Sequence, residues 1–395
     1  YIGNGSSTGP VMNLGWEAQW ILIKEISTGG QPWSVFDSMR GIVSAGGDNY
    51  IHPNENSSET TDLERVDVTP TGFKITDGGW INNSGETYAW MAIRRPDGYV
   101  GKPAEAGTDV FAMATGNSSA TIPNFTSNFP VDMSIIKPPA EVGSWWLGSR
   151  QTQKKEIKVN GTDAQTDWQY GVYDSNEGWQ NYSGHDSSDQ SWMWKRGQSF
   201  DLVTYNGTGG AKHVGHSLGA EPDMMWVRER DRGGVEWKVY HRDLGPTNVP
   251  RLNNDLAAEA SQTIFQSTDP TSTRFFVTGS ISVASEPYIA MLFKSVSGIS
   301  KVSSYTGTAN TLTITTGFQP RFLIIKRTDA TAYWLVLDTL RGWSQSSNDE
   351  YLKLNSSDAQ ISYWWGHPTS TGFVIDTIEG AANASGGSYI YYAHA

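Results

Sequence analysis

Short apolar stretches separated by turn-forming residues run along the whole chain. Segments such as FLIIKR (322–327), WLVLD (334–338) and YIAMLFK (288–294) are five to seven residues long and rich in branched and aromatic side chains. Clusters of Gly, Pro, Asn, Asp or Ser bound them, which is the pattern of short β-strands. From Trp237 to Val239 apolar and polar side chains alternate, as in a strand with two different faces. The pattern therefore predicts an all-β protein.

The order of these segments recurs along the chain. The stretch 305–395 contains YTGT, RFLIIKR, YWLVLD, PTSTGFVID and GSYIYYAHA in that order. The stretch 200–294 repeats it as FDLVTYNGT, MMWVRER, EWKVYH, DPTSTRFFV and EPYIAMLFK. The N-terminus follows with YIGN, WILIKE, PWSVFD, PTGFKI and TYAWMAIR, and a looser copy between them has FPVDMSIIKP, SWWLGSRQ and SWMWKR. Self-similarity at a fixed period indicates tandem structural units.

Four β repeats of about 95–100 residues account for the whole chain. We place them at 1–105, 106–200, 201–300 and 301–395, where Gly and Ser separate the copies. Each offers six or seven strands, enough for a two-layer β-sandwich, and the alternative architecture is a propeller-like ring of four β units. The strongest helical candidate, NDLAAEASQ (254–262), predicts only a short capped helix.

Tryptophans mark the same place in every copy. Trp33, Trp237 and Trp334 lie at equivalent strand positions, so we expect them to be core residues, and Trp146 is the counterpart in the looser copy. The position four residues later is always polar, and its occupants are Asp37, Arg150, His241 and Asp338. An acid, an imidazole and a guanidinium cannot perform the same proton chemistry, so this position is predicted to serve a strand end or turn.

The second repeat carries a polar, aromatic-rich insert at 151–190. Aromatic side chains among Asn, Asp and Gly are less easily absorbed into a core than those in strands, and they can stack on sugar rings. A second such place is YWWGHPTS (363–370), for which a structural turn is the competing interpretation. The candidate carbohydrate-binding residues are Trp168, Tyr170, Trp179, Tyr182, Trp364 and Trp365.

Composition excludes several classes of protein. The 29 Lys and Arg against 41 Asp and Glu give a net charge of −12, which disfavours nucleic acid as a partner. No apolar run approaches the roughly 18 residues of a membrane span. Without cysteine there are no disulfides or thiolate metal sites. The chain begins at Tyr1 with no charged-then-apolar leader, so any signal lies outside this sequence. The Gly, Trp and Tyr content favours an extracellular or virion β-protein over a cytosolic enzyme.

Candidate chemistry is sparse, and we predict that the protein is not an enzyme. Carboxylate pairs such as Asp186 with Asp189, or Asp329 with Asp338, have no motif that separates them from ordinary loop acids, and no nucleophile or phosphate-binding motif is present. His213 and His216 point to opposite faces if they lie in a strand, so no catalytic or metal residue is assigned. No cofactor is expected, although Ca²⁺ is a candidate ligand of the oxygen-rich stretches HDSSDQ (185–190) and SNDE (347–350).

The repeat at 200–294 resembles one found in bacteriophage tail-fibre and other virion structural proteins, particularly those of marine phages. The resemblance rests on the Tyr205, Gly207, Thr208 start, the GHSLG turn, the WKVYH strand, the PTSTRF step and the tyrosine-containing end. It is good in the third and fourth repeats, fair in the first and poor in the second. It implies an all-β tail fibre or appendage at the virion surface, with a role in host attachment and no catalytic residues.

The partners that this resemblance implies are other virion proteins and a host-surface glycan or receptor. A homo-oligomer is expected, and by analogy with fibres a trimer. The alternative functions are a carbohydrate-binding module of a secreted protein and a polysaccharide depolymerase.

Overall fold

The computed structural model describes residues 1–95, 103–118, 121–168, 171–181, 187–346 and 348–395. The regular structure in these ranges is strand, apart from three single-turn helices, η1 (Gly107–Asp109), η2 (Gly279–Ile281) and η3 (Thr339–Arg341). The all-β prediction is therefore confirmed. The short helix expected at 254–262 does not form, and Glu259 instead makes an isolated bridge with Val249. None of the described helices has the length and hydropathy that a membrane span requires.

The strands form four successive pairs of antiparallel sheets, which we call units 1 to 4. Unit 1 has a large sheet in the order β5-β4-β3-β2-β8 and a small sheet in the order β1-β7-β6. Its strands are β1 (Val11–Asn13), β2 (Ala18–Glu25), β3 (Ser34–Asp37), β4 (Asp48–Ile51), β5 (Thr60–Leu63), β6 (Val66–Thr69), β7 (Gly72–Ile75) and β8 (Tyr88–Arg94).

Unit 2 has a large sheet in the order β14-β13-β12-β11-β17-β9 and a small sheet in the order β10-β16-β15. Its strands are β9 (Phe111–Thr115), β10 (Phe125–Thr126), β11 (Met133–Lys137), β12 (Trp146–Ser149), β13 (Lys155–Lys158), β14 (Thr166–Asp167), β15 (Gly171–Val172), β16 (Gly178–Asn181) and β17 (Gln190–Trp194).

Unit 3 has a large sheet in the order β18-β23-β20-β21 and a two-stranded sheet of β19 and β22. Its strands are β18 (Phe200–Asn206), β19 (Lys212–Gly215), β20 (Met224–Glu229), β21 (Lys238–His241), β22 (Arg274–Val277) and β23 (Pro287–Phe293).

Unit 4 has a large sheet in the order β24-β32-β26-β27-β28-β29 and a small sheet in the order β25-β31-β30. Its strands are β24 (Ser300–Thr306), β25 (Leu312–Thr315), β26 (Phe322–Arg327), β27 (Leu335–Asp338), β28 (Asp349–Lys353), β29 (Ile361–Tyr363), β30 (Gly366–Thr369), β31 (Gly372–Ile375) and β32 (Ser388–His394).

The large sheets share one strand order. In units 2, 3 and 4 the last strand of the unit lies between the first strand and the strand that carries the apolar run, and in unit 1 the last strand, β8, pairs with the corresponding β2. A large sheet facing a small one makes each unit sandwich-like. Strands β18 and β24 begin one residue before the predicted limits at 201 and 301. The division into separate domains stays a prediction.

Each unit buries a core of its own between its two sheets. These cores are rich in the branched and aromatic residues that the strand pattern predicted, because alternate side chains of every strand point inward. Their central members are Ile21, Phe36, Phe73 and Tyr88 in unit 1, Phe125, Tyr173 and Trp179 in unit 2, Val227, Phe275 and Tyr288 in unit 3, and Leu323, Phe373 and Tyr389 in unit 4.

The Tyr-x-Gly motif that opens three units fixes the loop beside the last strand. The ring of Tyr305 stacks on Tyr389 with centroids 4.9 Å apart, and Gly307 N–H donates to Gly387 O at 2.8 Å. A Cβ at position 307 would lie 2.3 Å from Ala384 O, so only glycine fits there. The same arrangement joins Tyr205 to Tyr288 with Gly207, and Tyr1 to Tyr88 with Gly3.

Substitution of Gly307 by alanine is expected to lower the free energy of unfolding by about 1–3 kcal/mol, since the backbone of 307 or 384 must move to admit the Cβ. Gly210→Ala is the matched control, because nothing lies within 4 Å of the added atom, and its effect should stay within about 0.5 kcal/mol. Urea denaturation followed by tryptophan fluorescence measures both variants. Equal losses in the two would contradict the steric explanation.

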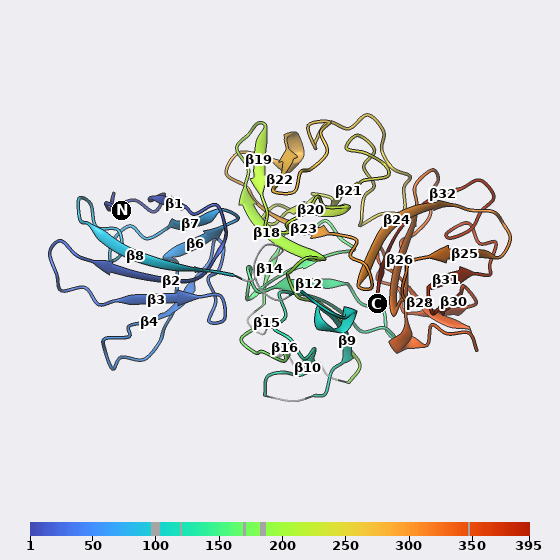
Figure 1. The fold of residues 1–395 in the computed structure, drawn as a ribbon, viewed down its shortest axis with the longest axis horizontal. Helices are drawn as coiled ribbons and strands as arrows, with labels where there is room; N and C mark the ends of the chain where they lie inside the picture. The colour runs from blue at the N-terminus through green and yellow to red at the C-terminus, as the bar shows by residue number, and fades with distance from the viewer. Residues whose placement is uncertain (96–102, 119–120, 169–170, 182–186, 347) are drawn as a thin grey trace.

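Units 2, 3 and 4 also share a second core. The outer face of each of their large sheets, meaning the face turned away from the unit's own small sheet, packs against the other two. Its largest buried members are Trp145, Trp192 and Trp194 of unit 2, Phe200, Trp226, Trp237 and Phe293 of unit 3, and Phe322, Trp334 and Tyr392 of unit 4. Figure 1 shows these units gathered together, with unit 1 (blue) to one side. Three units therefore surround one core, which is not the predicted alternative of a four-membered propeller-like ring.

Three tryptophans close a ring of hydrogen bonds around this shared core. Each donates its indole N–H to a backbone carbonyl of a neighbouring unit, and the bonds are Trp145 to Lys353 O (3.0 Å), Trp334 to Arg251 O (2.8 Å) and Trp237 to Lys158 O (2.9 Å). Unit 2 thus donates to unit 4, unit 4 to unit 3 and unit 3 to unit 2. This directional ring is the signature of an approximate threefold arrangement within one chain.

Three sequence predictions that rest on the repeat tryptophans need correction. The counterpart in unit 2 is Trp145, not Trp146, because Trp145 N–H donates to Asn160 Oδ1 as the other repeat tryptophans do to their own asparagines. The polar position four residues later is therefore Ser149, not Arg150. Trp237 and Trp334 are buried as predicted, whereas Trp33 is 39% exposed and belongs to no core.

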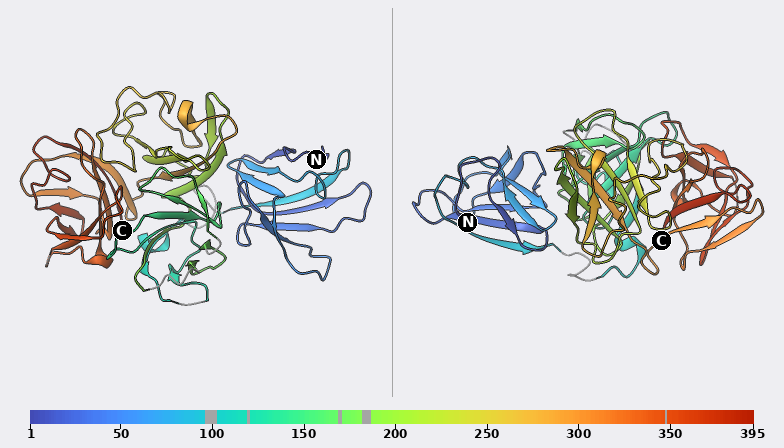
Figure 2. Two further views of the ribbon diagram at one scale, coloured as in Figure 1. Left: turned by 180° about the vertical axis from the view of Figure 1, so that it is seen from behind. Right: turned by 90° about the horizontal axis from the view of Figure 1, so that it is seen from above.

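Unit 1 joins the rest of the chain through polar contacts. Arg196 donates twice to the carboxylate of Glu17, both at 2.6 Å, and its Nε–H donates to Asp201 at 2.7 Å. Ser44 and Thr204 are linked by a hydroxyl hydrogen bond of 2.8 Å. The two further views in Figure 2 also place unit 1 beside the block made by the other three. Side chains from units 1, 2 and 3 thus meet at one junction.

Candidate functional site

The structure separates the aromatic residues predicted to bind carbohydrate. Trp179 is 3% exposed and stacks between Phe125 (5.2 Å) and Tyr173 (5.4 Å), while its Nε1–H donates to Ser191 Oγ at 3.0 Å. No ring face of Trp179 is left for a sugar, so its assignment as a stacking residue is corrected to core. Tyr170 and Tyr182 lie outside the described residues.

Trp168 is the half-buried member of this set. Its Nε1–H donates to Asn181 Oδ1 at 3.1 Å, and its ring lies 6.2 Å from that of Trp146. Beside it is a small hollow that Lys155 and Glu156 also line, where burial raises the pKa of Glu156 to about 8. Trp168 therefore keeps an accessible aromatic surface next to polar groups, and its sugar-stacking role stays a prediction.

The adjacent Trp364 and Trp365 have different environments. Trp365 is 2% exposed in the core of unit 4 and packs edge-on against Tyr351 at 5.2 Å, so it is a core residue and not a ligand platform. Trp364 is half-buried, and its ring lies 6.3 Å from His367. Neighbouring residues of an extended chain point in opposite directions, which explains why one of the pair is buried.

The carboxylates considered as catalytic pairs have structural partners. Asp338 is fully buried, caps η3 through Arg341 N–H (2.9 Å) and accepts from Trp192 Nε1 at 3.1 Å. Asp329 pairs with Arg327 at 2.8 Å. Asp189 is buried, and Asp186 lies outside the described part of the chain. These contacts account for Asp338 and Asp329 as parts of the fold.

The metal candidates are also engaged in the fold. His216 Nε2 lies 3.0 Å from Thr271 O, and its Nδ1 accepts from Leu218 N–H at 3.3 Å. Asp349, from the second oxygen-rich stretch, accepts from Trp365 N–H at 2.9 Å, and burial raises its pKa to about 6. Within the ranges given above, no three His, Asp or Glu residues are grouped as a metal would require.

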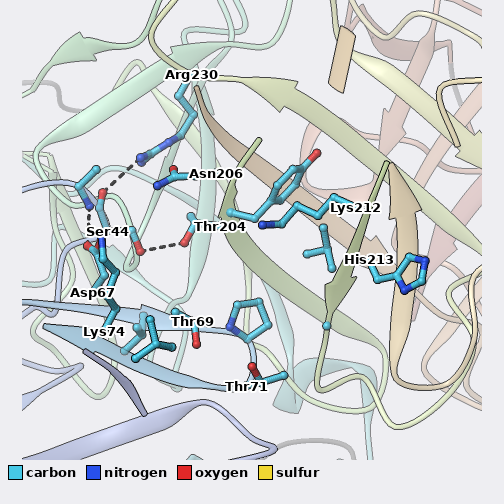
Figure 3. Close-up of a pocket in the computed structure, with 17 residues that line it drawn as sticks. Ser44, Asp67, Thr69, Thr71, Lys74, Thr204, Asn206, Lys212, His213 and Arg230 are labelled. Atoms are coloured by element: carbon cyan, nitrogen blue, oxygen red, sulfur yellow. Dashed lines mark hydrogen bonds between the residues drawn. The ribbon is translucent and has the colours of Figure 1, made fainter. Parts of the chain in front are cut away.

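Sequence reasoning missed a groove of about 300 Å³ between units 1 and 3. Figure 3 shows it bounded by strands of both units, with side chains from each converging on it. Three cations and one carboxylate line it, together with hydroxyl and amide groups, and the labelled members are Ser44, Asp67, Thr69, Thr71, Lys74, Thr204, Asn206, Lys212, His213 and Arg230. The lining is thus basic in a chain of net charge −12.

Hydrogen bonds fix one wall of this groove. Arg230 Nη2 donates to Ser44 O at 3.2 Å, and Ala45 N–H donates to Asp67 Oδ1 at 2.8 Å. Burial raises the pKa of Asp67 and lowers the pKa values of Arg230 and Lys212. The groove can offer hydroxyl and cationic donors to a small polar or anionic group.

The sequence matches a protein family described as a domain of unknown function (DUF7483) over residues 1–96 and 147–395. The stretch between these ranges holds the first strands of unit 2, the unit whose sequence departs most from the others. No curated protein matches the chain.

Proposed function

The chain belongs to the DUF7483 family, and we propose that it is a structural protein of a bacteriophage virion, part of a tail fibre or appendage that contributes to host attachment. The observation that carries this proposal is the core shared by units 2, 3 and 4, locked by the ring of tryptophan hydrogen bonds. Such packing makes one rigid body from three repeats. A rigid body that presents loops and grooves suits a load-bearing, adhesive role.

The partners in this proposal are other virion proteins and a glycan or receptor of the host surface. The likeness of the repeats at 200–294 and 301–395 to virion proteins supports it, as does the structural use of Asp338 and Asp329. The protein acts by adhesion and not by catalysis, and its place is the virion surface. Several weak contacts from a multimeric appendage add up to firm attachment.

Immunogold electron microscopy tests the virion role. An antibody raised against the recombinant chain is expected to label the tail appendages of particles released by a host strain that carries the gene. Peptide mass spectrometry of the same purified particles is the parallel measurement. Particles that contain no peptide of this chain would rule out the virion role.

A carbohydrate-binding role is the second candidate, and the half-buried ring of Trp168 favours it. If the ring stacks on a sugar, Trp168→Ala should weaken binding on a glycan array by more than about 1 kcal/mol, the usual threshold for a residue that dominates a binding surface. Val142→Ala is the control, because Val142 is 78% exposed and does not line the hollow beside Trp168. Binding that is unchanged in Trp168→Ala, or a wild-type chain that binds no glycan, removes this candidate.

A further inference from the structure

The outer face of unit 1's large sheet is apolar and uncovered. It is formed by Trp20, Leu22, Trp33, Met91 and Ile93, and among them Trp33 is 39% exposed and Met91 and Ile93 are each 52% exposed. In an antiparallel sheet of this kind one face usually packs on the core and the other, polar face is exposed to solvent. Here the face turned away from the small sheet carries large hydrophobic side chains instead. This pattern indicates a missing partner.

The same positions in the other three units are buried in the shared core. Strand pairing gives the equivalence, because Leu22 lies opposite Met91 as Ile324 lies opposite Tyr392. By this register Met91 corresponds to Trp192, Met291 and Tyr392, and Ile93 corresponds to Trp194, Phe293 and His394. All six counterparts are buried, at 0–1% exposed. Unit 1 therefore has the same kind of surface that units 2, 3 and 4 use to pack together, but no other unit of the chain packs against it in the described residues.

The local geometry that the packing uses is already formed in unit 1. Trp33 N–H donates to Asn54 Oδ1 at 2.8 Å, the bond that Trp334 makes with Asn355 at 2.9 Å. Lys24 Nζ donates to Gln31 O at 2.5 Å, as its counterpart Lys326 does to Ala332 O at the same distance.

The acceptor side of the packing is present as well. In units 2, 3 and 4 the carbonyl that accepts the indole N–H lies two residues before the asparagine that binds the repeat tryptophan's backbone. In unit 1 this asparagine is Asn54, so the corresponding carbonyl belongs to His52. His52 O accepts from Glu55 N–H at 3.0 Å, in the same turn as Lys353 O with Ser356 N–H at 3.1 Å. Lys353 O accepts the Trp145 indole in addition, so His52 O has a lone pair for the same role.

We propose that three copies of the chain associate through the outer faces of unit 1, packed as units 2, 3 and 4 are packed within one copy. Trp33 Nε1–H of each copy donates to His52 O of the next. Each of units 2, 3 and 4 donates to one neighbour and accepts from the other, so a contact of the same kind between copies is head-to-tail and closes at three. A symmetric dimer would have to bring the faces together at a different angle from the one that units 2, 3 and 4 adopt.

In the part of the chain that the structure describes, the junction with units 2 and 3 leaves this face clear. Unit 1 contacts units 2 and 3 through residues such as Glu17, Ser44 and Asp62, none of which belongs to the outer face. Association of three copies through this face therefore breaks none of these contacts between unit 1 and units 2 and 3. The proposal rests on the repeat geometry alone and holds whether or not the chain belongs to a virion.

Light scattering coupled to size-exclusion chromatography of the full chain tests it. The expected mass is three times the 43.4 kDa of one chain. Met91→Glu places three carboxylates in the proposed core and should give the mass of one chain, with an unchanged far-ultraviolet circular dichroism spectrum. The matched control is Ile378→Glu, which changes a 71% exposed residue of unit 4 and should stay trimeric.

Trp33→Phe removes the indole donor and keeps a smaller aromatic ring at the same place on the face. It should raise the concentration at which half the trimer dissociates by about fivefold or more, the factor expected from losing hydrogen bonds of ordinary strength. A wild-type chain with the mass of one or two copies overturns the proposal. So does a folded Met91→Glu variant that remains trimeric, since the association would then use another surface.

Discussion

Replacing Trp237 with alanine is expected to lower the free energy of unfolding by about 3–5 kcal/mol, the range for large aromatic residues removed from a core. Trp237 is fully buried where units 2 and 3 meet, and its indole bond to Lys158 O disappears with the ring. The variant leaves a cavity in the core that three units share, so all three should lose stability together. Urea denaturation measured by circular dichroism gives the change.

Trp33→Ala is the matched control for this prediction. Trp33 occupies the same place in its repeat and makes the same backbone bond to an asparagine, but it is 39% exposed. Its loss should cost about 1 kcal/mol, which is ordinary for a single substitution. Both substitutions are compared in the Met91→Glu background, so that association through unit 1 does not contribute. Equal losses would mean that the shared core does not carry the stability of units 2, 3 and 4.

The contrast between Trp237 and Trp33 shows how far the sequence could predict this fold. Strand period and turn residues predicted the all-β class, because a side chain's burial inside its own sandwich is decided by its immediate neighbours in the strand. Burial in the shared core depends on whether another unit packs against the outer face of the large sheet. Trp237 and Trp33 have equivalent neighbours in their own repeats, so the local sequence does not show which of them is covered. The equivalence of the repeats therefore predicted the burial of Trp237 correctly. It also predicted burial for Trp33, which is exposed.

The candidate site was predicted less well, for a related physical reason. Trp179 looked accessible because its sequence neighbours are polar, yet it is covered by Phe125, which lies far away in the chain. The groove between units 1 and 3 brings Ser44 beside Thr204, 160 residues later, and neither residue belongs to a motif. Contacts of such long range follow from how units dock, which the repeat pattern does not encode.

Loss of Arg196 should have an effect comparable to that of Trp237, by a different mechanism. Arg196 is buried between Glu17 of unit 1 and Asp201 of unit 3, with three hydrogen bonds of 2.6–2.7 Å. Removing one partner of a buried ion pair leaves charge without compensation, so Arg196→Ala is expected to lose about 3–5 kcal/mol. Lys154→Ala breaks the pair of Lys154 with Asp62, which also links unit 1 to unit 2 but is exposed, and should cost about 0–1 kcal/mol.

The pH dependence of Arg196→Ala distinguishes lost charge pairing from lost packing. In the wild type, burial pushes the pKa of Asp201 up, but Arg196 and Arg95 outweigh it and hold the pKa below its usual range. The ionised carboxylate of Asp201 therefore stabilises the folded wild type at neutral pH. This stabilisation is lost only as the pH falls below about 4, where the carboxylate of the unfolded chain takes up its proton. Without Arg196, burial should raise the pKa of Asp201 above its unfolded value, and the folded state then binds the extra proton. The variant should therefore regain part of its deficit relative to wild type when the melting temperatures are compared at pH 5 instead of pH 7. A deficit that is the same at both values would mean that packing of the Arg196 side chain, and not its charge, holds unit 1 in place.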